Sequence, residues 1–371
     1  LVDALLEWLR IPSISADPDY ADEVSRSADW FVQRLLSAGF PEVEVWSTPG
    51  LPTVYAEWSS DDPDAPTVVV YGHHDVQPVD PIELWDSAPF EPFVRATAYG
   101  EELVGRGAID DKGQMVYHLF GLAAHLAATG RTSPAVNLKV VVEGEEESGS
   151  THFRQLLIDN RERLRCDVVV VSDSGVYDRD TISVVTGMRG MIECQLDLRG
   201  PAGDVHSGSF GGAIPNPAAV AARLVAALHD ADRRVTLPGY YDGVVPLTDR
   251  ERELIAALPF DESRWLEGAR SSGTDGEAGY STLERVWARP TFEVNGLLSG
   301  FVGEGAKTVI PATAMAKVSM RLVPDQDPDR IAAAFEAHLK KVTPSAVDLK
   351  VTRMHGGRPW ITSYDNAFVQ A

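Results

Sequence analysis

The chain has 371 residues, of which 44% are hydrophobic and 24% are charged, and its formal net charge is −22. This length allows two or three domains, and the composition is that of an ordinary globular enzyme. The excess of negative charge argues against nucleic acid and anionic lipid surfaces as partners, because both need clustered Lys and Arg. The sequence has no apolar run of the roughly 20 residues that cross a bilayer, so we expect no membrane-spanning helix.

The two cysteines, Cys166 and Cys194, lie in apolar sequence surroundings without the CxxC spacing of a redox or zinc motif. They indicate neither a disulfide framework nor a Cys-rich metal site. A reducing compartment fits this pattern, and we predict a cytoplasmic location.

In the first half of the chain, segments of helical period alternate with apolar runs of strand length. This alternation predicts an α/β domain with helices covering a mainly parallel sheet. The expected helices are 24–40 and 113–129, and the second should end at Gly130. The expected buried strands are 67–71, 138–142 and 167–171.

From about Gly187 the pattern changes to strands that alternate apolar and polar residues, such as 192–198, with helical stretches at 217–229 and 328–341. This change predicts a second, α+β domain. We expect the first domain at 1–186, the second at 187–355 and a return to the first at 356–371. An excursion is expected at 236–288, which is rich in Pro, Gly and charge.

Histidine or acidic side chains follow each of the three predicted strands. The first strand runs into His73, His74 and Asp75, the second into the acidic stretch 143–147, and the third into Ser172 and Asp173. Ligands of open α/β sheets bind beyond the carboxyl ends of the strands, so these clusters should converge. The Gly-rich loop 105–113 adds further carboxylates just before a predicted helix. Imidazole and carboxylates without thiolate suit zinc, manganese or cobalt in a catalytic site, and one ion could not use them all.

Each of these features has a simpler explanation when it stands alone. An acidic run such as 143–147 is usually a solvated turn, and a single His after a strand is usually structural. Four such features on consecutive elements favour a shared metal site. Side chains alternate along an extended segment, so His74 should point away from its neighbours and receives no role. His118 and His125 also receive none, because no HExxH pattern supports them.

Two other classes of enzyme lack their motifs. The stretch 300–308 nearly matches a phosphate-binding P-loop, but Ala306 breaks the spacing, which argues against nucleotide binding. The sequence contains no GxSxG motif, so a serine hydrolase has no nucleophile elbow.

The motifs resemble those of the dinuclear-zinc metallopeptidase family that includes carnosinases, cytosolic non-specific dipeptidases, aminoacylases, glutamate carboxypeptidase and succinyl-diaminopimelate desuccinylase. The carnosinase and cytosolic dipeptidase branch is the most similar. The resemblance implies a zinc-peptidase catalytic domain with an inserted α+β lid or dimerisation domain, and a homodimer formed through that domain. It is carried by GHHDVQP at 72–78, GRGAIDDKG at 105–113, EEESGS at 145–150, SD at 172–173, DVHSG at 204–208, AKTVIP at 306–311 and MRLVP at 320–324.

The resemblance implies two divalent metal ions, with Zn²⁺ as the expected ion and Mn²⁺ or Co²⁺ as alternatives. By position, His73 and Asp173 would bind one ion, Glu147 would bind the other, and Asp110 would bridge the two. The peptide bond between Asp110 and Asp111 is expected to be cis.

The same resemblance implies the catalytic roles. Glu146 would act as the general base, and Asp75 would orient the imidazole of the metal-binding His. His206 would donate to the oxyanion, reaching over from a partner subunit. Arg321 and Thr308 would bind the free carboxylate of the substrate.

Two departures from the family pattern are visible. A further His ligand of the second ion is expected near the family's C-terminus, and no counterpart occurs before Ala371. Gly175 stands where this branch tends to have Tyr. The predicted function is hydrolysis of the peptide bond in dipeptides or short peptides. An N-acyl-amino-acid amidohydrolase or desuccinylase would use the same metals, and an inactive metal- or peptide-binding member is the alternative from another class.

Overall fold

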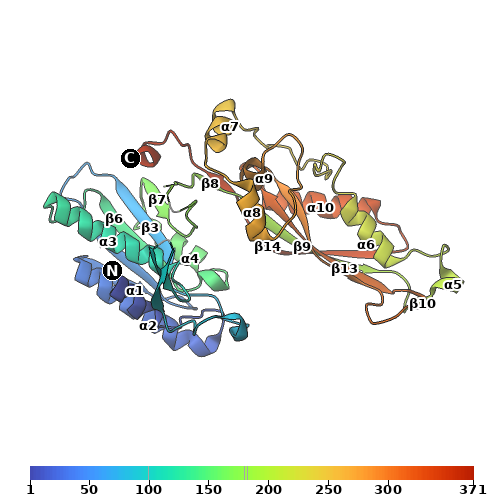
Figure 1. Ribbon diagram of the computed structural model, residues 1–371, viewed down its shortest axis with the longest axis horizontal. Helices are drawn as coiled ribbons and strands as arrows, with labels where there is room; N and C mark the ends of the chain where they lie inside the picture. Colours follow the sequence, from blue (N-terminus) through green and yellow to red (C-terminus); the bar gives the residue numbers. More distant parts are fainter. Residues whose placement is uncertain (99, 179, 182) are drawn as a thin grey trace. The chain divides into compact units, whose positions relative to one another are not determined.

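The structure is a computed structural model that describes residues 1–98, 100–178, 180–181 and 183–371. Contacts divide the chain into two units, Leu1–Ser183 and Val184–Ala371 (Figure 1). This division lies three residues before the predicted boundary at 186, and residues 356–371 group with the second unit. The expected return of 356–371 to the first domain therefore stays a prediction.

The first unit is built on a five-stranded sheet with the order β1-β2-β6-β3-β7. Strand β3 is parallel to both β6 and β7, whereas β2 is antiparallel to its neighbours β1 and β6. Four of the five strands therefore run in one direction, which confirms the predicted mainly parallel sheet. The strands are β1 (Glu42–Trp46), β2 (Thr53–Trp58), β3 (Thr67–His73), β6 (Asn137–Glu143) and β7 (Val168–Val171).

Helices cover both faces of this sheet. Alternation along β6 sends Val140 and Val142 into the core beneath α1, α2 and α3, and Val141 into the core beneath α4. Both α2 and α3 stop at glycines in the left-handed region, Gly39 and Gly130, which side chains with a Cβ disfavour. The helices are α1 (Val2–Leu9), α2 (Ala21–Ala38), α3 (Lys112–Thr129) and α4 (Phe153–Asp159).

The prediction of a buried strand at 167–171 is right in position and wrong in burial. β7 is the last strand of the sheet order, so it has a strand neighbour on one side within the described residues. Its side chains Val169 and Val171 are 53% and 44% exposed. Cys166, just before it, is exposed as well, whereas Cys194 is buried.

The second unit is centred on a four-stranded antiparallel sheet with the order β11-β13-β9-β14. Residues of α6 and α10 join the strands in one apolar core, which includes Leu196 and Phe335. The excursion expected at 236–288 contains α7 (Asp249–Ala256), α8 (Glu262–Ala269) and α9 (Thr282–Ala288). The other elements are β9 (Gly190–Arg199), β11 (Thr291–Ser299), β13 (Thr313–Leu322), β14 (Asp348–Gly357), α6 (Pro217–Ala226) and α10 (Pro328–Val342).

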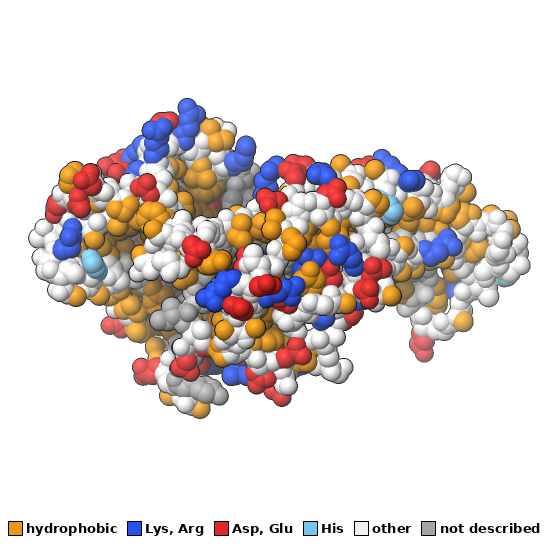
Figure 2. Space-filling view, turned by 90° about the horizontal axis from the view of Figure 1, so that it is seen from above, with side chains coloured by type: hydrophobic (Ala, Val, Ile, Leu, Met, Phe, Trp, Pro, Cys, Tyr) orange, Lys and Arg blue, Asp and Glu red, His pale blue; other side chains and the backbone are white. Residues whose placement is uncertain are grey.

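Three smaller strand pairs and two short helices, α5 (Ser207–Phe210) and α11 (Ala367–Gln370), lie outside these sheets and their covering helices. β4 (Phe93–Thr97) pairs with β5 (Gly100–Val104), β8 (Gly187–Met188) with β15 (Trp360–Ile361), and β10 (Val205–His206) with β12 (Val309–Ile310). On the face drawn in Figure 2, acidic and basic side chains are interspersed with apolar ones. Among the described residues, no helix has the length and apolarity that a bilayer span needs.

Candidate active site

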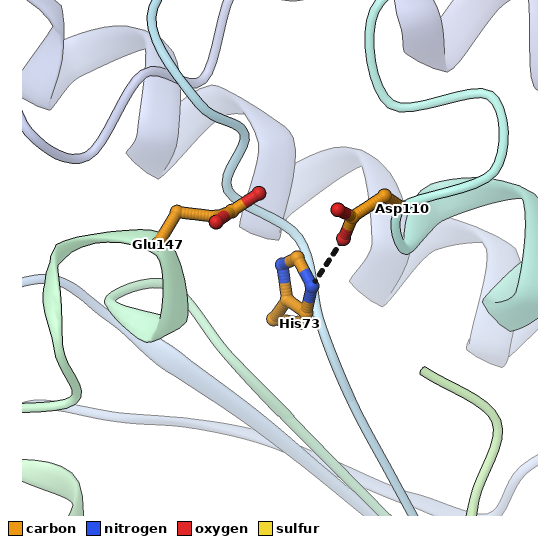
Figure 3. Close-up of side chains that lie close together, drawn as sticks. All are labelled: His73, Asp110 and Glu147. Atoms are coloured by element: carbon orange, nitrogen blue, oxygen red, sulfur yellow. Dashed lines mark hydrogen bonds and ion pairs between the residues drawn. The ribbon is translucent and has the colours of Figure 1, made fainter. Parts of the chain in front are cut away.

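The carboxyl ends of three neighbouring strands, β6, β3 and β7, and the loop before α3 bring one imidazole and several carboxylates together. Two overlapping groups each have their ligand atoms within 4.8 Å of one another. The first group is His73, Asp110 and Glu147, and the second is His73, Glu146 and Asp173. Figure 3 shows Glu147 and Asp110 extending toward each other above the His73 ring. Nitrogen and oxygen donors that lie this close together can bind a divalent transition metal.

The chain can approach itself closely here because position 72 has no side chain. A Cβ on Gly72 would lie 2.3 Å from Oδ2 of Asp111, closer than any Cβ contact allows. The same oxygen accepts a hydrogen bond from the main-chain N–H of His73 at 3.2 Å. The peptide bond between Asp110 and Asp111 is cis, which confirms that prediction.

A buried lysine connects the loop to the N-terminal helix. Lys112 is fully buried at the start of α3, and its Nζ donates to the carbonyl oxygens of Trp8 and Ile11 at 3.3 and 2.9 Å. These bonds attach the loop that carries Asp110 to the end of α1.

The His73 imidazole is buried between two sets of acceptors. Its Nδ1 lies 3.1 Å from the carbonyl oxygen of Asp75 and 3.4 Å from its Oδ1. Its Nε2 lies 3.0 Å from Oδ1 of Asp110 and 3.9 Å from Oδ2 of Asp173. The Nδ1–H donates on the Asp75 side, and Nε2 faces the other two carboxylates, where a bound cation would take the place of its proton.

The cluster carries more negative charge than it can easily hold. Burial lowers the pKa of His73, but hydrogen bonds to Asp110 and Asp75 outweigh it and raise the pKa to about 11. Burial, with repulsion from neighbouring carboxylates, raises the pKa of Glu146, Glu147 and Asp173 against the opposing charge of His73. A bound cation would displace the protons from these groups.

Asp75 contacts residues from both candidate groups. Its Oδ2 accepts the main-chain N–H of Glu147 at 3.0 Å, in addition to the contacts that its carbonyl and Oδ1 make with His73. Burial raises the pKa of Asp75, but the hydrogen bond and charge of His73 outweigh it, so the pKa is lowered. An ionised carboxylate at this position keeps the imidazole in one orientation.

Two side chains without a predicted role touch the predicted site residues or their neighbours. The Nε2 of His118 lies 2.7 Å from Oγ of Ser172, which precedes Asp173. The Gln77 amide donates to Oε2 of Glu147 at 2.6 Å. Gln77 could have been found from alternation, because it shares a side of the extended segment with Asp75. No sequence signal pairs His118 with Ser172, which are far apart in the chain.

His74 is buried on the opposite side of the segment. Its Nε2 lies 3.0 Å from the carbonyl oxygen of Pro52, and burial lowers its pKa to about 4. It is a neutral structural residue.

In the second unit, the structure brings His206 and Thr308 together across the β10–β12 pair. Oγ1 of Thr308 lies 3.3 Å from Nε2 of His206. The Gly208 N–H donates to Nδ1 of His206 at 3.0 Å, so the neutral ring carries its proton on Nε2. The exposed His206 therefore presents an N–H donor rather than an acceptor. Arg321 is exposed on a different strand, β13.

Comparison with known proteins gives three kinds of match. The family described as a peptidase dimerisation domain matches residues 186–347. A Cys-Gly metallodipeptidase from Candida albicans is 32% identical over 390 residues, which cover 100% of this chain and 79% of the relative. Human beta-Ala-His dipeptidase is 31% identical over 382 residues, which cover 98% of this chain and 74% of the relative. The solved structure of an M20 family metallo-carboxypeptidase from Sulfolobus solfataricus matches with a TM-score of 0.81 and 31% identity, over 100% of this chain and 81% of that chain.

Proposed function

Because the chain belongs to the M20 family of metallopeptidases, we propose that it hydrolyses the peptide bond of dipeptides with two divalent metal ions bound in its first unit. The observation that carries the proposal is the meeting of one imidazole and four carboxylates in two groups, each within 4.8 Å, at the ends of neighbouring strands. The names of two similar proteins, a Cys-Gly metallodipeptidase and a beta-Ala-His dipeptidase, support a dipeptide as the substrate.

The donor set fits the expected metals. By the family resemblance, His73 and Asp173 would hold one ion, Glu147 would hold the second and Asp110 would contact both. All four residues belong to the two candidate groups, and every donor is nitrogen or oxygen. We propose Zn²⁺, with Mn²⁺ or Co²⁺ as substitutes. When bound, such a pair of ions polarises the scissile carbonyl and lowers the pKa of a water molecule.

Glu146 is proposed to move the proton. It accepts a proton from the attacking water as the water oxygen bonds to the carbonyl carbon, and it delivers that proton to the amine nitrogen as the C–N bond breaks. Burial raises the pKa of Glu146, which brings a carboxylate base closer to neutral operating pH.

Residues of the second unit are proposed to stabilise the reacting carbonyl and to recognise the substrate. The Nε2–H of His206 is the donor for the oxyanion, and its orientation is supported by the Gly208 N–H on the other ring nitrogen. Arg321 suits the free carboxylate because its planar fork can bind two oxygens at once, and Thr308 adds a hydroxyl.

We further propose a homodimer formed through the second unit, in which His206 completes the partner's site. The match to a dimerisation domain supports association. Among the described residues, β11 is at one edge of its sheet, with Val294, Leu297 and Leu298 46%, 51% and 57% exposed. An exposed apolar edge strand favours pairing with another chain.

Leu297→Lys should shift the mass in light scattering from dimer to monomer, whereas Val245→Lys, at a position 65% exposed elsewhere in the unit, should not.

Metal removal tests the proposed function. The protein is stripped with a chelator, metal loss is verified by elemental analysis, and Zn²⁺, Mn²⁺ or Co²⁺ is returned. Dipeptides are then compared with acetyl- and succinyl-amino acids as substrates. Turnover of dipeptides that disappears and returns with metal supports the proposal. Turnover of the acylated amino acids alone would favour the amidohydrolase alternative, and unchanged turnover after stripping would contradict the metal-dependent reaction. The cytoplasmic location stays a prediction.

A further inference from the structure

We propose that Gln77 is a positioning residue for Glu147, and that it sets the affinity of the metal ion bound by Glu147 without affecting the other ion. This inference rests on the proposed function. The amide Nε2 of Gln77 lies 2.6 Å from Oε2 of Glu147 and 3.3 Å from its carbonyl oxygen. Both partners belong to one residue, so Gln77 acts on Glu147 rather than on the cluster as a whole.

The chemistry of the partners fixes the direction of the amide. A carboxylate oxygen and a carbonyl oxygen are both acceptors, so the NH₂ group of Gln77 must face them and its oxygen must face away. The Asp75 carboxylate accepts the main-chain N–H of Glu147 at 3.0 Å. Asp75 and Gln77 lie two residues apart, and both side chains contact Glu147. Together they hold the main-chain N–H, the carbonyl and one carboxylate oxygen of Glu147.

This arrangement leaves one oxygen of Glu147 for a metal ion. Oε2 is engaged by Gln77, and Figure 3 shows the Glu147 carboxylate directed toward Asp110. Glu147 is only partly buried, so without the Gln77 contact its side chain would sample several rotamers. The amide orders the carboxylate without adding charge to a cluster that is already strongly acidic.

The contacts also predict that the effect is selective. Asp75 touches His73 and Glu147, which are assigned to different ions, so loss of its carboxylate should weaken both. Gln77 donates to Glu147, and within the described part of the chain its hydrogen bonds reach neither His73 nor Asp173. If Gln77 only stabilised the loop, its loss would weaken the binding of both ions. If it positions Glu147, its loss weakens the binding of one ion.

The test is a Zn²⁺ titration of the metal-free full chain in competition with a chromophoric chelator, which reports two binding steps without any activity measurement. Gln77→Met keeps the length of the side chain and removes the donor. We expect one step to weaken by about 10- to 100-fold, the usual cost of losing a hydrogen bond to a metal ligand, and the other to stay unchanged. Gln155→Met is the matched control, because the Gln155 amide also donates to a carboxylate, Oδ1 of Asp159 at 2.8 Å, on a helix that supplies no predicted ligand.

The outcomes are separable. Two unchanged steps, or two steps weakened equally, would overturn the role of Gln77 while leaving the two-metal function in place. A wild-type chain that binds fewer than two ions would overturn both proposals. Circular dichroism of the metal-free variants establishes that neither substitution alters the fold.

Discussion

The two units hold their candidate catalytic side chains in different ways. In the first unit, His73 and Asp75 are fully buried, and Asp75 contacts both His73 and Glu147. In the second unit, His206 is exposed at the end of a two-residue strand, where Gly208 and Thr308 contact its ring.

This difference follows from what each group must do. A metal ligand has to be in place before the ion arrives, so its orientation is fixed by buried hydrogen bonds. A donor to a reaction intermediate has to reach a molecule that comes from solvent, so it must keep an exposed N–H. Substitutions of the proposed metal ligands in the first unit should therefore change metal content, and substitutions at the exposed pair should change turnover alone.

The largest expected effect is that of Asp110→Ala. Asp110 is the carboxylate nearest Nε2 of His73, at 3.0 Å, and it is assigned to both ions. Its loss should reduce bound metal and lower turnover to background. Elemental analysis of the purified variant measures the metal directly, and two retained ions per chain would show that Asp110 is not the bridge.

Glu146→Gln should separate chemistry from metal binding within the first unit. The amide keeps the size of the side chain but cannot accept a proton from water, so kcat should fall by about 10²- to 10⁴-fold. Metal content should stay near normal. Steady-state kinetics on metal-loaded protein gives the result, and a wild-type kcat would mean that another group is the base.

His206→Ala tests the second unit. Removing an oxyanion donor should lower kcat by about 10²- to 10³-fold and leave metal affinity unchanged. Mixing His206→Ala with Glu146→Gln protomers should restore partial activity if His206 acts on its partner's site, because one site of the mixed dimer is then intact. No recovery after verified subunit exchange would place His206 in its own subunit's site or outside the reaction.

The smallest effect concerns a buried carboxyl behind the cluster. Burial raises the pKa of Glu143 to about 7, although Tyr71 and Ser150 donate hydrogen bonds to it. A folded-state pKa above the ordinary value of 4.5 means that Glu143 stabilises the fold fully below pH 4.5 and that this contribution is lost as the pH rises through about 7. As the pH rises through that range, the free energy of unfolding of Glu143→Gln should therefore fall less than that of the wild type. Urea unfolding of chelator-treated protein at a series of pH values measures it, and parallel pH profiles of variant and wild type would contradict the assignment.

Two features of the first unit could be predicted from sequence, the mainly parallel sheet and the motifs that follow its strands. Both depend on patterns among residues that are close together in the chain. Apolar runs bounded by polar residues place β3 and β6 within two residues of the structure, and the glycine after α3 marks its end. The candidate ligands follow from the same runs, because parallel strands deliver the residues at their carboxyl ends to one edge.

Tertiary structure alone decided which neighbours those elements have. Four consecutive valines in β7 favour a buried strand, but its place at the edge of the sheet leaves Val169 and Val171 exposed. The contacts of His118 with Ser172 and of Gln77 with Glu147 join residues 54 and 70 positions apart. Local periodicity carries no information about such pairs, because strand order and helix packing bring them together only when the chain folds.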